Sequence, residues 1–291
     1  MAMPVQGGSE GLHEWRLEEA RHLIEKAGKG SLESLVMVDA LQRLGIAYHF
    51  EEETQILLQE QLHISTFDGH PSRSSNNIFQ SFMIKEDNYS GYVFDLKLCK
   101  DIFGLTSLYE ASHLGVQAED ILDEAADFTR RALSLSADKF LYVGNGMSSQ
   151  VLGELVRKTL SNPFHKSMPR FNSMSFQYYF TGPYEWTRTI GELAILDSNL
   201  VQSINQTEIR QISKWWTDLG LAKELKFAGD QPMKWYMWPM AILSDPSLSQ
   251  ERVDLTKAIA MIYIIDDVFD VYGSPNELIL FAQTINRKFE P

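Results

Sequence analysis

The chain has 291 residues, of which 44% are hydrophobic and 22% are charged. These fractions are typical of folded globular proteins and exclude collagen-like, coiled-coil and intrinsically disordered classes. The formal net charge of −13 disfavours phosphate backbones and anionic membranes, so we expect neither a nucleic-acid nor a membrane partner.

The cellular compartment is predicted from the cysteine count and from the opening residues. The single cysteine, Cys99, excludes an intramolecular disulfide and a zinc site built from several cysteines. Acidic and basic residues alternate near the start, whereas transit peptides are poor in acids and signal peptides need an apolar centre. The longest interior apolar run, Ala258 to Ile265, is far shorter than the ~20 residues of a membrane span. We therefore expect a cytoplasmic protein without a transit or signal peptide.

Apolar residues recur at helical spacing along most of the chain. A helix from Leu32 to Leu44 is predicted, with Ser31 as its N-cap and Gly45 as its stop. Two further amphipathic helices are expected from Asp120 to Leu133 and from Ile190 to Ile204. No clear two-residue alternation marks a strand. The pattern therefore predicts an all-α fold, with an α+β fold as the alternative.

Two irregular segments interrupt the helical pattern. The stretch from Phe67 to Gly91 is rich in Ser and Asn, which is typical of a long surface loop. The second break, from Ser161 to Pro183, precedes a region that holds five of the six tryptophans. We therefore predict an amino-terminal domain of residues 1–183 and a second domain of residues 184–291.

An apolar helix followed by aspartates is the most informative segment. The run from Ala258 to Ile265 is apolar on every side, which is typical of a helix enclosed by other helices. Asp266 and Asp270 share the face of Tyr263, and Asp267 lies roughly 100° to the side. Buried carboxylates are costly unless a cation compensates them. Mg²⁺ is typically held by one or two carboxylates together with substrate phosphates, so this cluster indicates a diphosphate site.

Structural interpretations remain open for the acidic residues. The aspartates can instead lie at an exposed helix end, with Gly273-Ser274-Pro275 as the turn beyond. The acid-rich segment from Glu119 to Asp127 is interpreted as the solvated face of an amphipathic helix. Asp197 falls on an apolar stripe and is interpreted as a structural carboxylate rather than a ligand. The histidines show no ligand pairing at helical spacing, so the sequence does not support a zinc hydrolase.

An aromatic segment precedes the aspartates. Gln231, Trp235 and Trp238 share one helical face, and Pro239 is expected to kink their helix. Aromatic rings usually fill a core, but their faces also stabilise cations. A pocket with Mg²⁺ at one end and aromatic rings along its wall would suit a reaction that creates a carbocation.

Taken together, these segments resemble the plant terpene synthases of class I. The similarity is carried by Leu108 to Gly115, Glu119 to Ala125, Leu193 to Gln202, Lys214 to Ala222, Leu255 to Lys257 and Ile265 to Gly273. The resemblance implies an amino-terminal helical domain followed by the opening helices of an α-helical catalytic bundle. It also implies a carbon–oxygen lyase that releases diphosphate from a prenyl diphosphate substrate.

The resemblance also assigns roles to residues. Asp266 and Asp270 would ligate Mg²⁺, with Mn²⁺ as an alternative ion, and Asp267 would support them. Together with Trp238, which matches a pocket tryptophan of the family, these aspartates are the predicted catalytic residues. The predicted substrate contacts are Gln231, Trp235, Trp238 and Tyr263.

The product class is expected from the same resemblance. The run from Trp235 to Met240 is most similar to the branch that makes acyclic alcohols, nerolidol from farnesyl diphosphate or linalool from geranyl diphosphate. The lack of an Arg-Arg pair ahead of Trp15 agrees with that branch, because cyclising members commonly carry one. A cytoplasmic protein would favour farnesyl diphosphate and nerolidol.

Three features depart from the family pattern. Gly229-Asp230-Gln231 stands where the family has an arginine first, so a cation for the departing diphosphate is missing. The segment from Gln59 to Ser107 is shorter than in the family and has no arginine-rich helix. A second metal-binding motif is expected on a later helix, but the sequence ends at Pro291, so we expect a carboxy-terminally truncated chain.

Two alternatives to an active synthase follow from these features. The first is a catalytically inactive isoform, either a monomer or an interaction partner of a full-length synthase. The second is a prenyl-chain elongase, which would share the aspartates but not the context around Trp215 and Trp216.

Overall fold

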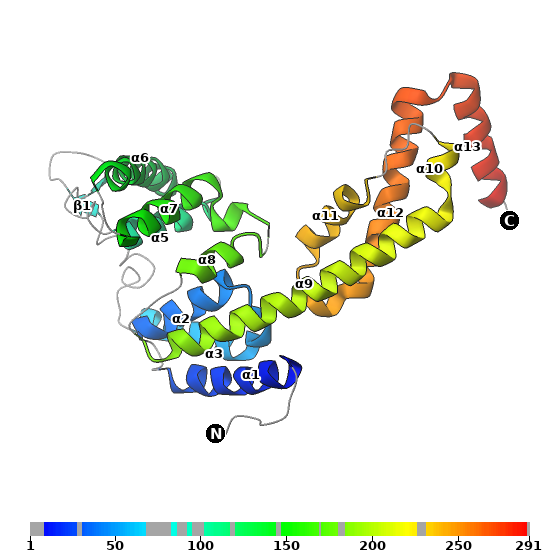
Figure 1. The fold of residues 1–291 in the computed structure, drawn as a ribbon. Coiled ribbons are helices and arrows are strands. Elements are labelled where there is room, and N and C mark those ends of the chain that lie inside the picture. The colour runs from blue at the N-terminus through cyan, green and yellow to red at the C-terminus, as the bar shows by residue number, and fades with distance from the viewer. Residues whose placement is uncertain are drawn as a thin grey trace. The chain divides into compact units, whose positions relative to one another are not determined.

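The computed structural model describes most of the chain as helices (Figure 1). The described residues are 9–27, 31–67, 83–85, 92–94, 102–116, 120–143, 147–168, 170–179, 184–225 and 231–289. Within these ranges the only strands are two of three residues each, so the predicted all-α fold is confirmed. The chain divides into two compact units, Met1–Asp197 (unit 1) and Ser198–Pro291 (unit 2). The predicted domain boundary at Pro183 lies outside the described residues.

One part of unit 1 packs the first helices of the chain against the start of a long helix. Its elements are α1 (Ser9–Lys26), α2 (Leu32–Arg43), η1 (Ala47–His49), α3 (Glu51–Phe67) and the first turns of α9 (Trp186–Leu219). Their shared core includes Ile24, Leu41, Phe50, Ile190 and Leu193, all of them buried. The apolar stripes that predicted α2 and the start of α9 are therefore part of the surfaces that join these helices.

The start and end of α2 follow the predicted signals. The Ser31 hydroxyl accepts a hydrogen bond from the backbone N–H of Ser34 at 3.2 Å, which satisfies one of the free donors of the first turn. At the other end Gly45 adopts a φ of +76°, a conformation that residues with a Cβ rarely adopt. Both the predicted N-cap and the predicted stop are confirmed.

Removing the cap should weaken unit 1 measurably. We expect Ser31→Ala to lower the free energy of unfolding by about 1 kcal/mol, because the Ser34 N–H loses its partner. Ser31→Asp should leave it nearly unchanged, since a carboxylate also caps a helix. Urea unfolding followed by circular dichroism measures both variants. An equal loss of unfolding free energy in the two variants would contradict the role of Ser31 as the N-cap of α2.

The other part of unit 1 packs three helices around a second core. Its elements are α5 (Ile102–Ser112), α6 (Asp120–Val143), α7 (Met147–Ser161) and η3 (Phe164–Lys166), whereas α8 (Ser173–Tyr179) packs Phe176 against the first core. Leu105, Leu108, Leu133 and Val156 form the buried centre of α5, α6 and α7. Asp120, Asp123, Glu124 and Asp127 are exposed, which confirms the predicted solvated face of α6.

A short hairpin corrects part of the predicted surface loop. Strands β1 (Met83–Lys85) and β2 (Tyr92–Phe94) pair antiparallel, with Ile84 opposite Val93. The prediction of loop from Phe67 to Gly91 is therefore wrong for β1, while most of that stretch lies outside the described residues. Three residues are too few for an alternating pattern to be recognised in the sequence.

Unit 2 is built on the later turns of α9. Its further elements are α10 (Leu221–Glu224), α11 (Pro232–Ile242), η4 (Pro246–Leu248), α12 (Ser249–Asp267), the π-helical turn η5 (Val268–Tyr272) and α13 (Pro275–Phe289). Trp216, Trp235, Ala260 and Ile264 form one core cluster, so α9, α11 and α12 share it. None of the described helices is both long and apolar enough to span a membrane.

Candidate active site

The pairing of α11 with α12 brings two predicted site residues together. The indole N–H of Trp238 donates to the hydroxyl of Tyr263 at 3.1 Å, although the two residues are 25 positions apart. The ammonium of Lys234 lies 4.7 Å from the centre of the Tyr263 ring, close enough for a cation–π contact. An aromatic pair, in which Trp238 is exposed and Tyr263 is half-buried, therefore lies beside one cation on this face of unit 2.

The other residues predicted on α11 are placed differently. Trp235 is buried, and its ring meets the ring of Trp216 edge-to-face at 4.9 Å between centroids. Gln231 is exposed immediately before the helix. Positions i and i+3 on a helix are about 60° apart, which is enough to bury Trp235 while Trp238 stays 52% exposed. Substrate contact by Gln231 and Trp235 remains a prediction.

The three aspartates lie where α12 changes into a π-helical turn. Asp266 and Asp267 are the last residues of α12, and Asp270 lies within η5. The turn closes with the Gly273 N–H donating to the Val268 carbonyl at 2.7 Å. A Cβ at Gly273 would lie 2.5 Å from that oxygen, so a larger residue would force this backbone apart. Single π-helical turns occur frequently at functional sites.

The carboxylates of these aspartates are accessible. Asp266 and Asp270 are exposed and Asp267 is half-buried. Within the described part of the chain, no side-chain hydrogen bond or ion pair ties up any of the three. Hard carboxylate oxygens that are accessible and unpaired fit the ligands that Mg²⁺ prefers.

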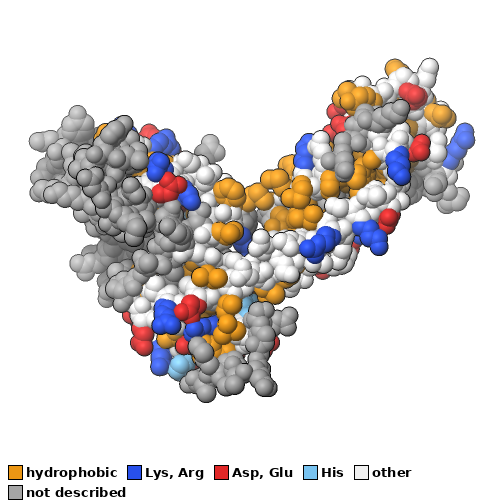
Figure 2. All heavy atoms as spheres, viewed as in Figure 1, with side chains coloured by type: hydrophobic (Ala, Val, Ile, Leu, Met, Phe, Trp, Pro, Cys, Tyr) orange, Lys and Arg blue, Asp and Glu red, His pale blue; other side chains and the backbone are white. Residues whose placement is uncertain are grey.

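The apolar run before the aspartates is not enclosed as predicted. Ala260 and Ile264 are buried against α9 and α11, but Ile262 is 63% and Ile265 44% exposed. The prediction of a helix buried on every side is therefore wrong for this chain, because α12 packs along one side only. Figure 2 shows hydrophobic side chains at the surface in this region. The aspartates lie at an exposed helix end, as the alternative interpretation of the sequence predicted. This exposure also leaves room for a diphosphate beside them.

A buried ion pair holds α12 in place. Arg252 is 1% exposed, and its guanidinium donates to both carboxylate oxygens of Glu208 on α9, at 2.9 and 2.7 Å. The Tyr236 hydroxyl on α11 donates to the same carboxylate at 2.6 Å. Burial raises the pKa of Glu208, but the hydrogen bonds from Arg252 and Tyr236 outweigh burial and hold it below its ordinary value. This network joins α9 to α11 and α12, the two helices that carry the candidate site.

The sequence analysis missed this network, although a signal for it exists. Arg252, Thr256, Ala260 and Ile264 recur every four residues and are all buried. An arginine on the buried stripe of a helix needs a carboxylate partner, because an unpaired buried charge is strongly unfavourable. The spacing alone could therefore have indicated a buried ion pair, but not its partner on α9.

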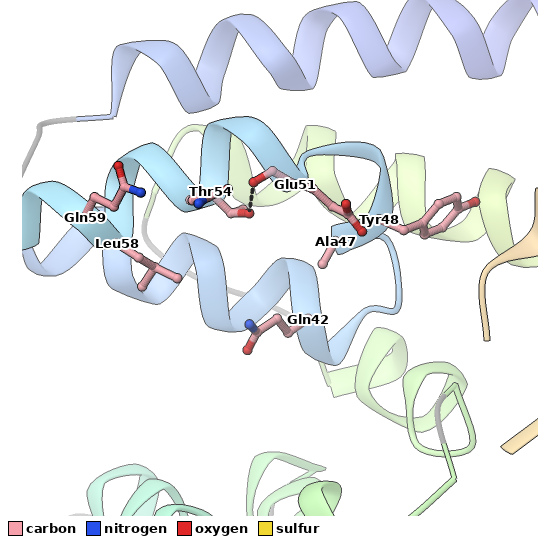
Figure 3. A pocket seen from close by; sticks show the side chains of 8 residues that line it. Gln42, Ala47, Tyr48, Glu51, Thr54, Leu58 and Gln59 are labelled. Atoms are coloured by element: carbon pink, nitrogen blue, oxygen red, sulfur yellow. Dashed lines mark hydrogen bonds between the residues drawn. The ribbon is translucent and has the colours of Figure 1, made fainter. Parts of the chain in front are cut away.

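A cavity lies in unit 1, between α2, η1 and α3 (Figure 3). Its volume is about 490 Å³. The lining side chains are those of Gln42, Ala47, Tyr48, Glu51, Thr54, Gln55, Leu58 and Gln59. None of these side chains is basic, and the one formal charge is that of Glu51, which would repel a diphosphate. We therefore place the candidate active site on α11 and α12.

An all-α fold with an accessible aspartate turn beside an aromatic pair is the arrangement expected of a class I terpene synthase. Two family models match the chain: "Terpene synthase, N-terminal domain" over residues 68–160, and "Terpene synthase family, metal binding domain" over residues 217–288. The second match contains Trp238, Tyr263 and all three aspartates. The chain belongs to the plant terpene synthase family.

Curated relatives agree with this assignment. Probable terpene synthase 13 of Ricinus communis is 43% identical over 95% of this chain and 49% of its own length. An (E)-nerolidol synthase of Cannabis sativa is 40% identical over 93% of this chain and 51% of its own length. The chain thus spans about half the length of these relatives.

A solved structure gives the same fold. Isoprene synthase from grey poplar leaves superposes with a TM-score of 0.78 at 29% identity, covering 96% of this chain and 54% of that one. The same enzyme has been solved with three Mg²⁺ ions and dimethylallyl-S-thiolodiphosphate, and that complex superposes with a TM-score of 0.75 at 28% identity. A divalent metal cofactor is therefore supported for this family.

Proposed function

We propose that the chain acts as a terpene synthase that ionises farnesyl or geranyl diphosphate and forms an acyclic alcohol, nerolidol or linalool. The observation that carries the proposal is the adjacency of two features on α12. Tyr263, hydrogen-bonded to Trp238, is followed three and four residues later by Asp266 and Asp267, whose side chains have no hydrogen bond or ion pair to the described residues. The matched metal-binding region thus holds an aromatic pair close in sequence to an acidic turn, and that turn runs into the π-helical turn η5.

The aspartates and the aromatic pair would have separate tasks. Asp266 and Asp270 would hold Mg²⁺ or Mn²⁺, with Asp267 in support. When bound, the metal neutralises diphosphate charge and so promotes its departure. The carbon–oxygen bond breaks with its electron pair on the diphosphate, and the Trp238 ring faces the allylic cation that remains. The hydrogen bond to Tyr263 fixes the orientation of that ring.

The alcohol arises when water attacks the cation and then loses a proton. The 40% identity to an (E)-nerolidol synthase and the run from Trp235 to Met240 support the acyclic branch. We further propose a cytoplasmic location, which would favour farnesyl diphosphate.

Incubation of the purified chain with each diphosphate tests this proposal. With Mg²⁺ present we expect nerolidol from farnesyl diphosphate or linalool from geranyl diphosphate, detected by gas chromatography of the volatiles. Reactions with EDTA should give no product, because EDTA removes the metal that the departure of the diphosphate requires. Failure to form a product from either substrate would overturn the proposed activity for residues 1–291.

A second candidate is an inactive isoform that binds a full-length synthase. The observation in its favour is the exposure of large apolar side chains in unit 2, among them Ile262, Val271 and Leu280. Size-exclusion chromatography with light scattering should then show a complex when the chain is mixed with a full-length relative. A chain that stays monomeric beside the synthase would refute this candidate.

A further inference from the structure

Two histidines and one aspartate meet in unit 1, away from the candidate active site. His13 comes from α1, His49 from η1 and Asp197 from α9. Among the described residues, these three form the group of metal-ligating side chains whose donor atoms all lie within 4.8 Å of one another. The aspartates of α12 do not form such a compact group of three in the described structure.

Two of the three distances between the donor atoms are close to those around a tetrahedral metal ion. The Nε2 atom of His49 lies 2.8 Å from Asp197 Oδ1, and the Nε2 atom of His13 lies 3.5 Å from the same oxygen. Ligand atoms around a tetrahedral zinc ion, with bonds of 2.0–2.1 Å, are about 3.3 Å apart. These two distances lie on either side of that spacing, and the donor nitrogens of the two histidines lie within 4.8 Å of each other, so rotation of the imidazoles would bring the three donors around one ion.

His13 has a polar atom that the protein alone does not satisfy. The residue is 8% exposed, and its Nε2 is buried without a hydrogen bond to any described group. Leaving a buried donor or acceptor unpaired costs about 1–3 kcal/mol. A metal ion bound to Nε2 would remove that cost.

Asp197 is held in an orientation that suits a ligand. Arg170 donates to Oδ2 at 3.0 Å, and the Tyr48 hydroxyl donates to Oδ1. Asp197 is buried and hydrogen-bonded, as the structural interpretation of this residue predicts. Its Oδ1 atom also lies 2.8 Å from His49 Nε2 and 3.5 Å from His13 Nε2, and the proposal below adds a ligand role to the structural one.

We propose that His13, His49 and Asp197 bind a divalent transition-metal ion of the zinc type. Two imidazoles and one carboxylate are typical zinc ligands, whereas Mg²⁺ prefers oxygen ligands alone. Arg170 serves as the outer partner that fixes the ligating carboxylate through Oδ2. The ion ties α1 to η1 and α9, and therefore stabilises unit 1 in proportion to its binding free energy.

Calorimetric titration of the full chain with Zn²⁺, after removal of metals with EDTA, tests the site. We expect one zinc ion per chain and a rise in the melting temperature. Loss of an outer partner of a metal ligand weakens binding by up to ~100-fold. His13→Gln removes a ligand itself, so it should weaken zinc binding by more than that. His22→Gln is the matched control, since His22 is exposed on the same helix, and it should bind zinc like the wild type.

Two further measurements keep the test decisive. Asp266→Asn should retain the zinc site, which distinguishes it from any ion at α12. Co²⁺ added to the wild-type chain should give visible absorption bands that Zn²⁺ removes and Mg²⁺ leaves unchanged, so the result does not depend on the folding of a variant. Absence of these bands, or equal zinc affinity of His13→Gln and His22→Gln, would overturn the proposal.

Discussion

Replacing Asp266 with Asn is expected to reduce turnover of the prenyl diphosphate at least ~1,000-fold. The amide keeps the size of the side chain but removes the charge that would hold Mg²⁺, and metal stabilisation of a departing oxygen contributes several kcal/mol. Asp266 is exposed, with no side-chain hydrogen bond or ion pair to the described residues, so its loss should not disturb folding. Product formation over a range of Mg²⁺ concentrations measures the effect.

A matched control lies on the same helix. Asp254 is also an exposed aspartate of α12, but it is paired with Lys257 at 2.9 Å and Gln250 at 3.0 Å. Asp254→Asn should leave turnover unchanged. Binding of Mn²⁺, followed by electron paramagnetic resonance, gives a second measure that needs no activity. Equal Mn²⁺ binding and turnover in Asp266→Asn and the wild type would refute the metal assignment.

Replacing Arg252 with Met should destabilise unit 2 by ~3–5 kcal/mol. The substitution leaves the Glu208 carboxylate buried without its bidentate partner, and an uncompensated buried charge has an effect of this size. It also removes a donor to the Leu243 carbonyl at 2.9 Å. Denaturant unfolding followed by tryptophan fluorescence reports on unit 2, which contains Trp215, Trp216, Trp235 and Trp238.

Two variants separate this effect from loss of any cation. Lys257→Met removes a partly exposed cation of the same helix and should cost no more than ~0.5 kcal/mol, as surface pairs contribute little. Arg252→Met combined with Glu208→Leu should recover most of the loss, because no buried charge then remains. Similar destabilisation by Arg252→Met and Lys257→Met would contradict the buried pair.

The same pair makes stability depend on pH in a defined direction. The pKa of Glu208 is lowered in the folded chain, so its contribution is fully present above the unfolded value of about 4.3. That contribution is lost as the pH falls through the folded pKa. The wild type and Arg252→Met should therefore become closer in stability in acid.

Local sequence signals predicted the helices well because each depends on neighbours along the chain. The Ser31 cap bonds to a backbone three residues away, and the charged face of α6 needs only water. The Trp235 and Trp238 stripe was only partly informative. A 60° difference on one helix separates a core ring from an exposed ring, and packing against Trp216 decides which is which.

The sequence by itself determined the all-α class, the aspartate turn and the aromatic segment, because helical periodicity and motif spacing are properties of short stretches. Only the tertiary structure decided which distant side chains meet. It brought Trp238 into hydrogen-bond contact with Tyr263 and Glu208 into contact with Arg252, and it placed His13 and His49 beside Asp197. It also left Ile262 and Ile265 exposed. An apolar run shows which side chains of a helix can be buried. Whether they are buried depends on the helices that pack against them.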